Sequence, residues 1–208
     1  NKVQLNSFHL KNVTANVFVD SCGKANYDIF PPSESVEDTS AFVNPFDLIA
    51  IDAVEIENLC ATYNDQQSGI SASVGQLCCS LDAQLSSDFT GKANLQTSVK
   101  SISAKLAGEN PILADISGFT LDVDAEKTID IVDGNIVLLL PEISFKMGET
   151  SFLDKRNVRL ELPLSSSFDS LTLSLQKAKL ALENHEVVLT GKAQYCSNSD
   201  VAMNIDFA

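Results

Sequence analysis

Residue types that carry out acid–base or nucleophilic chemistry are few in this chain of 208 residues and stand far apart. The two histidines are His9, inside a strand-like segment, and His185, in a turn-like one, and neither has a neighbouring serine or cysteine that marks a nucleophile. The pattern S-x-x-K occurs at Ser21–Lys24 and Ser174–Lys177, but that motif requires both side chains on one helical face. Both copies lie in strand or turn context, and G-x-S-x-G is absent. The sequence therefore predicts no catalytic residues and a protein that is not an enzyme.

One acidic segment, Asp122–Glu126, resembles the start of a calcium-binding loop. The glycine that such a loop needs at its sixth position is Lys127 here, and the glutamate expected at its twelfth is Asp133. A solvated strand face explains the same residues. The chain also has no C-x-x-C pair and no glycine-rich phosphate loop, so the sequence predicts neither a metal nor a cofactor.

The five cysteines cannot all pair with one another, and the chain is longer than a disulfide-framed domain. Cys78 and Cys79 are adjacent, a geometry too strained to bond readily. A turn at "NDQQSG" would set Cys60 opposite about residue 73, roughly five positions of ~3.3 Å each from Cys78. We therefore expect buried free thiols, at Cys22, Cys60, Cys78, Cys79 and Cys196.

The charge balance restricts the partners. The chain has 28 acidic and 14 basic residues and a formal net charge of −14. Nucleic acids and anionic membrane surfaces are both bound through clustered lysine and arginine, so neither is an expected partner. No window reaches the ~18 apolar residues of a spanning helix. Because the sequence begins without a signal-like segment and stops within the strand-like "NIDFA", we expect a soluble piece of a longer chain.

Alternation of apolar and polar residues dominates the chain and predicts β-strands. In "LTLSLQKAKLALENHEVVLTGKA" the apolar positions shift by one residue between Leu175 and Ala178, and "AVEIENLCATYND" shifts at Asn58. Such shifts inside a strand are typical of β-bulges. Asn184 and His185 are expected to form a turn, and Asp133-Gly134, between two apolar runs, predicts a hairpin.

Helical periodicity is scarce, and the proline-rich polar segment 31–46 is expected to be a loop within one domain that spans residues 1–208. The predicted fold class is all-β, a mostly antiparallel sheet of serial hairpins with little helix. Two architectures remain open from the residues alone. The sheet either closes into a sandwich or barrel, or leaves an apolar trough that can hold acyl chains.

The N-terminal half resembles the AsmA family of bacterial envelope proteins. The resemblance rests on a strand followed by Gly23-Lys-Ala-Asn-Tyr27-Asp28, then a variable loop, then a second strand that ends in a Tyr63-x-Asp65 turn before Gly69. The family more often has tryptophan where Tyr27 stands. The match covers roughly residues 5–195 and is most specific over residues 8–82.

The resemblance implies an elongated, curved sheet that forms an open groove or an incomplete barrel. It implies a periplasmic location, a parent chain anchored in the inner membrane by an N-terminal helix, and a role in outer-membrane assembly or in phospholipid transport between membranes. Phospholipid acyl chains and outer-membrane assembly proteins are the partners that it implies. The family offers no catalytic residues to transfer to this sequence.

Two hypotheses follow from this reading. The first is a lipid-handling scaffold whose groove contains Ile136, Leu138 and Leu140 from one strand and Leu171, Leu173 and Leu175 from a later one, and in which both faces of 136–140 avoid water. The second is a surface or adhesion-type β-sandwich with a closed core, no lipid ligand and binding through loops such as 31–46. A continuous apolar concavity would favour the first.

Overall fold

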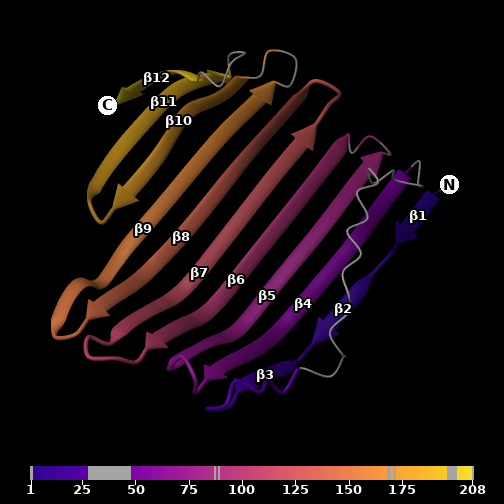
Figure 1. Cartoon of the computed structure of the whole chain (residues 1–208). Helices are drawn as coiled ribbons and strands as arrows, with labels where there is room; N and C mark the ends of the chain where they lie inside the picture. The colour runs from indigo at the N-terminus through magenta and orange to yellow at the C-terminus, as the bar shows by residue number, and fades with distance from the viewer. Residues whose placement is uncertain are drawn as a thin grey trace.

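One twelve-stranded sheet makes up the structure, a computed structural model that describes residues 2–27, 48–86, 88, 90–167, 170, 172–195 and 201–207 (Figure 1). Strands account for 82% of the chain, and none of the residues in these ranges is helical. The sheet is long, mostly antiparallel and open. The all-β fold class and the serial hairpins expected from the sequence are therefore confirmed. The predicted loop at 31–46 lies outside the described residues.

Consecutive antiparallel hairpins build most of the sheet, in the order of the sequence. Six strands of 16 to 18 residues form its centre, and three shorter ones follow. The central strands are β4 (Leu48–Asp65), β5 (Ile70–Ser86), β6 (Gly91–Leu106), β7 (Ile112–Lys127), β8 (Ile131–Met147) and β9 (Thr150–Ser167). The shorter ones are β10 (Thr172–Leu182), β11 (His185–Tyr195) and β12 (Val201–Phe207).

The N-terminal edge is a strand in three pieces that run parallel to β4. These are β1 (Lys2–Leu5), β2 (Phe8–Lys11) and β3 (Thr14–Val19), and all three keep the same offset, with Lys2 opposite Leu48, Phe8 opposite Val54 and Thr14 opposite Cys60. The breaks at residues 6–7 and 12–13 lie beside the places where β4 shifts its register against β5. The edge strand is thus interrupted wherever its neighbour bulges.

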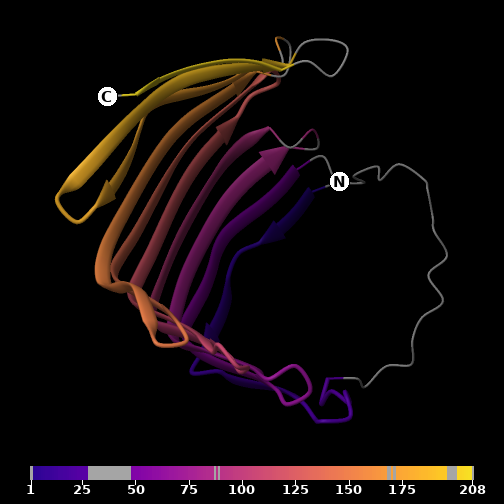
Figure 2. The ribbon, with the colours of Figure 1, turned by 60° about the vertical axis from the view of Figure 1, so that its left-hand side comes forward.

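A line of bulges crosses the middle of the sheet and bends it. Positive φ angles between 48° and 80° mark this line at Asn12 beside the edge strand, Asn58 in β4, Gln76 in β5, Gly118 in β7 and Lys155 in β9. Figure 2 shows the long strands bent toward one side at this level, so that each has an upper and a lower arm. The shift predicted at Asn58 is confirmed. The shift predicted before Ala178 is also confirmed, at Lys177 with φ 59° in β10.

The hairpin predicted at Asp133-Gly134 is wrong. These two residues lie inside β8, and the chain turns at residues 128–130 instead, where Thr128 N donates to Ile131 O at 2.8 Å. A turn at Asp133-Gly134 would set Val123 opposite Ser144. The observed register sets Val123 opposite Ile136, and each apolar cross-strand pair contributes about 0.2–1 kcal/mol. Summed over two long strands, this preference outweighs one favourable turn dipeptide.

The turn between β10 and β11 lies one residue earlier in the sequence than predicted. Leu182 pairs with His185, so Glu183 and Asn184 form the turn and His185 begins β11. Glu183 adopts φ 55°, as the first position of such a two-residue turn requires.

The segment after β3 is a compact turn held by polar side chains. Asp20 Oδ1 accepts hydrogen bonds from the backbone N–H groups of Cys22 at 2.8 Å and Lys24 at 2.9 Å. Asn26 Oδ1 accepts from Phe18 N at 2.9 Å, and Asn26 Nδ2 donates to Asn16 O at 2.9 Å. The segment Gly23-Lys-Ala-Asn26 is therefore part of a turn that hydrogen bonds hold against β3.

The thiols of Cys22, Cys60, Cys78 and Cys79 are free, and Cys196 lies outside the described residues. Cys60 lies near Gln76, whose N–H approaches its sulfur at 3.5 Å. The thiols are less buried than expected, because Cys22 is exposed and the other three are half-buried. A sheet without a second layer has little interior in which to bury them.

Few side chains of the described residues are fully buried. The buried apolar ones are Val19, Ala50, Ala83, Val99 and Ala178. The chain of 22.4 kDa has an accessible surface of 14255 Å², whereas a compact monomer of this mass has roughly 9,400 Å². No described element covers either face of the sheet. The part of the chain that the structure describes contains no helix that could cross a membrane.

Candidate functional site: an apolar trough

One face of the upper arms is lined by apolar side chains that continue from strand to strand. Residues directly opposite each other in an antiparallel pair project from the same face. One such row crosses seven strands, through Phe8, Val54, Leu81, Leu95, Val123, Ile136 and Leu162. The next row extends to β11, through Leu10, Ile56, Cys79, Thr97, Leu121, Leu138, Leu160, Leu180 and Val187.

The apolar face continues through the bend into the lower arms. At the bend the row is Leu59, Leu77, Val99 and Phe119. Below it, one row is Val74, Ile102, Ile116 and Ile143. Another row is Tyr63, Ala72, Ala104, Ala114, Phe145 and Leu153, and the last is Ile70, Leu106, Ile112 and Met147. The residues named in these rows are uncharged, and the charged residues that continue two of the lower rows are Arg156, opposite Ile143, and Asp65, opposite Ile70.

The spacing of apolar residues at the bend assigns this face to the concave side. In β4–β8, successive apolar residues are two positions apart along each arm but three apart at the bend, at Ile56/Leu59, Val74/Leu77, Val99/Ile102, Ile116/Phe119 and Leu140/Ile143. Two residues therefore project from the opposite face at this level, and the outside of a bend is the longer path. Lys100 and Ser101 there are exposed, whereas Val99 is only 4% exposed. We call the concave apolar face the trough.

The structure brings together the predicted groove residues that it describes. Ile136, Leu138 and Leu140 project into the trough from β8. Leu175 lies opposite Leu164 on the same face, and Leu173 lies opposite Ser166 and is 45% exposed near the end of the sheet. Leu171 lies outside the described residues.

The expectation that both faces of residues 136–140 avoid water does not hold. Val137 lies between Asp122 and Glu161 on the convex face, and Leu139 lies there between Thr120 and Arg159. Both are half-buried by their neighbours within the sheet, without a covering layer. Their cross-strand partners are polar. At residues 136–140, therefore, only the trough face is apolar across the neighbouring strands.

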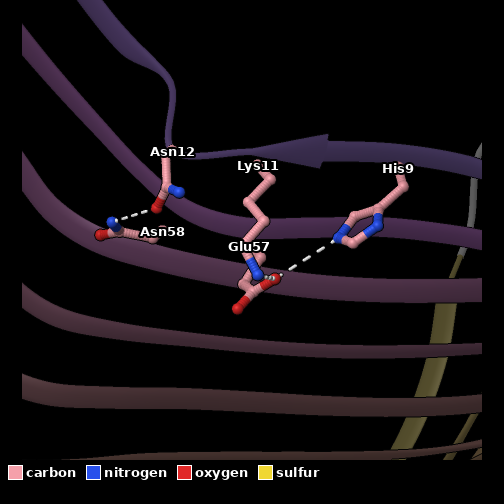
Figure 3. Close-up of polar contacts among 5 residues, drawn as sticks. All are labelled: His9, Lys11, Asn12, Glu57 and Asn58. Atoms are coloured by element: carbon pink, nitrogen blue, oxygen red, sulfur yellow. Dashed lines mark hydrogen bonds and ion pairs between the residues drawn. The ribbon is translucent and has the colours of Figure 1, made fainter.

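The convex face is polar and carries ion pairs. At its N-terminal edge, Glu57 Oε2 lies 2.7 Å from Lys11 Nζ and 3.5 Å from His9 Nε2 (Figure 3). The hydrogen bond from the Lys11 ammonium lowers the pKa of Glu57 below its usual value. Lys92 and Glu126 form a further pair at 3.1 Å. Ion pairs thus gather on the convex face, whereas the rows of the trough are mainly apolar.

Polar side chains also connect the edge strand to β4 by hydrogen bonds at the bend. Asn58 Nδ2 donates to Asn12 Oδ1 at 2.8 Å, and both asparagines have left-handed backbones (Figure 3). Thr62 Oγ1 donates to Asn16 Oδ1 at 2.7 Å farther along β4. Of these residues the sequence analysis singled out only Asn58, as a phase shift within one strand, although the three-residue apolar spacing in five successive strands is a signal that locates the whole bend.

The convex face carries acidic side chains that do not form a metal site within the described residues. A depression of about 580 Å³ on this face includes Asp82, Lys92, Asn94, Asp124 and Asp133. Asp124 accepts a hydrogen bond from Asn94 Nδ2 there. Among the described residues, no three His, Cys, Asp or Glu side chains are arranged to hold a metal ion. Asp122, Asp124 and Glu126 project from a solvated strand face.

No protein family, curated protein or solved structure matches this chain. The class of molecule defined by the fold is a single-layer, open β-sheet with a continuous apolar concave face.

Proposed function

We propose that this chain is a non-enzymatic lipid-handling scaffold that holds acyl chains in the trough. The observation that carries the proposal is the continuity of the apolar rows over up to nine neighbouring strands, with no described element covering them. An exposed apolar surface larger than a few hundred Å² is typical of a binding site.

An acyl chain has the right chemistry to cover this surface. Burying one leucine side chain contributes about 1.5–3 kcal/mol, and each buried methylene of a ligand contributes about 0.8 kcal/mol. Neighbouring strands lie about 4.8 Å apart, so an acyl chain placed along a row contacts a new side chain at every strand. A chain crossing several strands gains enough free energy to bind without any charged headgroup site.

The resemblance to the AsmA family supplies the cellular context of the proposal. We propose that the chain belongs to that family and acts in the periplasm, within a parent protein anchored in the inner membrane. Its role there is outer-membrane assembly or phospholipid transport between membranes, with outer-membrane assembly proteins as further partners. Support for this context comes from the motif residues Gly23–Tyr27 and Tyr63–Gly69. The open sheet favours it over a closed β-sandwich, which needs a second layer.

The test compares two leucines that are adjacent in β8 and project from opposite faces. Leu138 lies in the trough between Leu121 and Leu160, whereas Leu139 lies on the convex face between Thr120 and Arg159. We expect native mass spectrometry of the purified protein to detect bound phospholipid. Leu138→Glu is expected to lower the lipid-bound fraction at least fivefold, and Leu139→Glu to leave it within about twofold of wild type.

Far-UV circular dichroism of both variants reports whether the sheet is intact. Retention of lipid by folded Leu138→Glu, or equal loss in both folded variants, contradicts binding in the trough. Absence of lipid from the wild-type protein, even after incubation with phospholipid vesicles, overturns the proposed function as a whole. A milder substitution, Leu138→Gln, replaces the glutamate if that variant unfolds.

A further inference from the structure

We infer that the lower arm of β9 pairs with the same segment of a second copy of this chain, antiparallel and about a two-fold axis. The segment is residues 150–156, which we call the free edge. Figure 1 shows the β10–β11 hairpin ending partway along β9, so that the rest of β9 extends beyond it. The inference concerns an interface between copies and goes beyond the proposed function, because it does not depend on what the trough binds.

The free edge begins where β10 stops. β10 pairs with β9 from Ser167 to Val158, and the next residue of β9 is held by the β10–β11 turn. There the carbonyl of Asn157 accepts from Glu183 N at 3.0 Å, and Asn157 N donates to Glu183 Oε1 at 3.0 Å. Among the described residues, no strand pairs with β9 on this side beyond Asn157. The backbone N–H and C=O groups of an unpaired edge can pair with another strand, so the free edge has room for one more.

The side chains of the free edge are exposed, although one of them is large and apolar. Of residues 150–156, only Leu153 is half-buried. Phe152 is 56% exposed, even though its ring lies tilted against that of Phe145 with 5.8 Å between the centroids. Native sheets seldom leave a large apolar side chain on an unpaired edge, because such an edge associates with other strands. Phe152 therefore marks the free edge as a contact surface.

The charges beside Phe152 complement a second copy of the same segment. Glu149 and Lys155 each lie three positions from Phe152, on opposite sides of it. When two copies pair antiparallel with Phe152 opposite Phe152, Glu149 of each copy therefore lies opposite Lys155 of the other. Neither residue forms an ion pair within its own chain among the described residues, whereas Arg156 lies 3.9 Å from Glu183. Aromatic pairs and opposite charges directly across an antiparallel ladder are stabilising.

Other occupants fit the free edge less well than an antiparallel copy. A lysine at a sheet edge opposes the addition of a neutral or basic strand, because its ammonium loses water without gaining a partner. Parallel pairing of two copies would set Lys155 beside Lys155 and Glu149 beside Glu149. Antiparallel pairing about Phe152 avoids both repulsions and sets Asp154 opposite the uncharged Thr150. Its two-fold axis is perpendicular to the sheet, so the troughs of both copies open on the same side.

Sedimentation velocity of the 208-residue chain tests the pairing, at about 150 mM salt and from about 1 to about 200 µM protein. We expect a reversible dimer with twice the mass of the 22.4 kDa chain. Phe152→Lys is expected to raise the Kd of the dimer about tenfold or more, because two ammonium groups then face each other at the axis. The matched control is Ile129→Lys in the turn between β7 and β8, where Ile129 is 77% exposed. It makes the same change of charge and should leave Kd within about twofold of wild type.

Reversal of the two charges identifies the register. Glu149→Lys and Lys155→Glu alone should each raise Kd about fivefold, and the double variant should return it to within about twofold of wild type. A general effect of charge predicts the opposite for Glu149→Lys, because this substitution changes the net charge from −14 to −12 and so weakens the repulsion between copies.

Far-UV circular dichroism reports whether each variant is folded. A chain that stays monomeric over the whole concentration range contradicts the inference, and so does a dimer that folded Phe152→Lys leaves as tight as wild type. A folded double variant that does not restore the dimer contradicts antiparallel pairing about Phe152. If Phe152→Lys unfolds, the charge-reversal series decides alone. None of these outcomes changes the lipid test at Leu138, so the two proposals fail separately.

Discussion

Aspartates at the strand ends hold the turns of this sheet through hydrogen bonds to neighbouring backbone and hydroxyl groups. Asp65 Oδ1 accepts from Gln67 N at 2.9 Å and Ser68 N at 3.1 Å, and Asp65 Oδ2 accepts from Ser68 Oγ at 2.6 Å. The hydrogen bond from the Ser68 hydroxyl lowers the pKa of Asp65. Asp88 has the same role in the next turn along the chain. Acidic residues thus fix the turns.

The ionisation of the single residue Asp88 leads to a testable prediction. Hydrogen bonds from Ser86 and Thr90 lower its pKa to about 2, whereas an unfolded aspartate titrates near ~3.9. The turn therefore gains stability from the ionised carboxylate above about pH 4, and that gain is lost as the pH falls toward 2. Carbon-detected NMR titration of the carboxyl group should give a pKa of about 2, and Ser86→Ala should raise it.

A serine far from the turn provides the control for this titration. Ser98 lies on the convex face of β6, opposite Thr120, and Ser98→Ala should leave the pKa of Asp88 unchanged. An Asp88 carboxyl that titrates at the ordinary value in the wild-type protein contradicts the hydrogen-bonded turn.

The strands owe their bend to bulges that fall on the same level in consecutive elements. A single bulge twists one strand, but neighbouring strands that bulge together preserve their register and share the bend. The pairings from β5 to β8 show no register shift across the bend, although the apolar pattern of each strand changes phase there. The phase change keeps the apolar side chains on the concave face along the full length of each strand.

Substitutions of Asn58 test how much the bulge in β4 contributes to stability. Its φ of 59° is disfavoured for β-branched residues, and its amide donates to Asn12. We expect Asn58→Val to lower the free energy of unfolding by about 1–3 kcal/mol, from backbone strain and the lost hydrogen bond, as measured by urea denaturation. Asn58→Gly should lower it less, because glycine adopts positive φ without strain.

The matched control is Asn64, an exposed asparagine in the same strand opposite Ser71. Its backbone is regular, so Asn64→Val should change stability by less than about 0.5 kcal/mol or raise it. Equal losses in Asn58→Val and Asn64→Val would contradict a special backbone requirement at the bend.

The whole molecule is held together laterally, because no described element packs across the sheet. An accessible surface of 14255 Å² leaves many apolar side chains half-exposed, including Leu180 at 42% and Val187 at 44% in the trough. Inter-strand hydrogen bonds and same-face contacts supply the cohesion, and both decrease toward the edges. The interior strands have neighbours on two sides, whereas among the described residues β1, β2 and β12 pair with a strand on one side only and the end of β3 also bridges Ala25.

Hydrogen exchange should follow this lateral order. In lipid-free protein we expect the slowest amide exchange in β5–β8 and exchange at least tenfold faster in β1 and β2, which pair only with β4 over four residues each. Peptide-resolved mass spectrometry measures the gradient. Uniform protection from β1 to β8 would indicate a covering layer over the edge and contradict the single-layer arrangement.

Local patterns in the sequence determined the fold class and two of the bulges. Alternation at consecutive residues is enough to specify strands, and the phase shifts at Asn58 and before Ala178 are visible because each lies within one strand. The same alternation placed Ile136, Leu138 and Leu140 on one face. These features depend only on side-chain direction along a single strand, which has a fixed period of two.

Register and curvature were decided by the tertiary structure. The Asp133-Gly134 signal is local, but the position of the turn depends on which pairing aligns apolar residues such as Val123 and Ile136 across β7 and β8. The trough likewise exists because irregularities at Asn58, Gln76 and Gly118 fall on the same level of the sheet, although they are far apart in the sequence. Cross-strand pairing is a contact between distant residues, so the concave face follows from the register of the whole sheet and from no single segment.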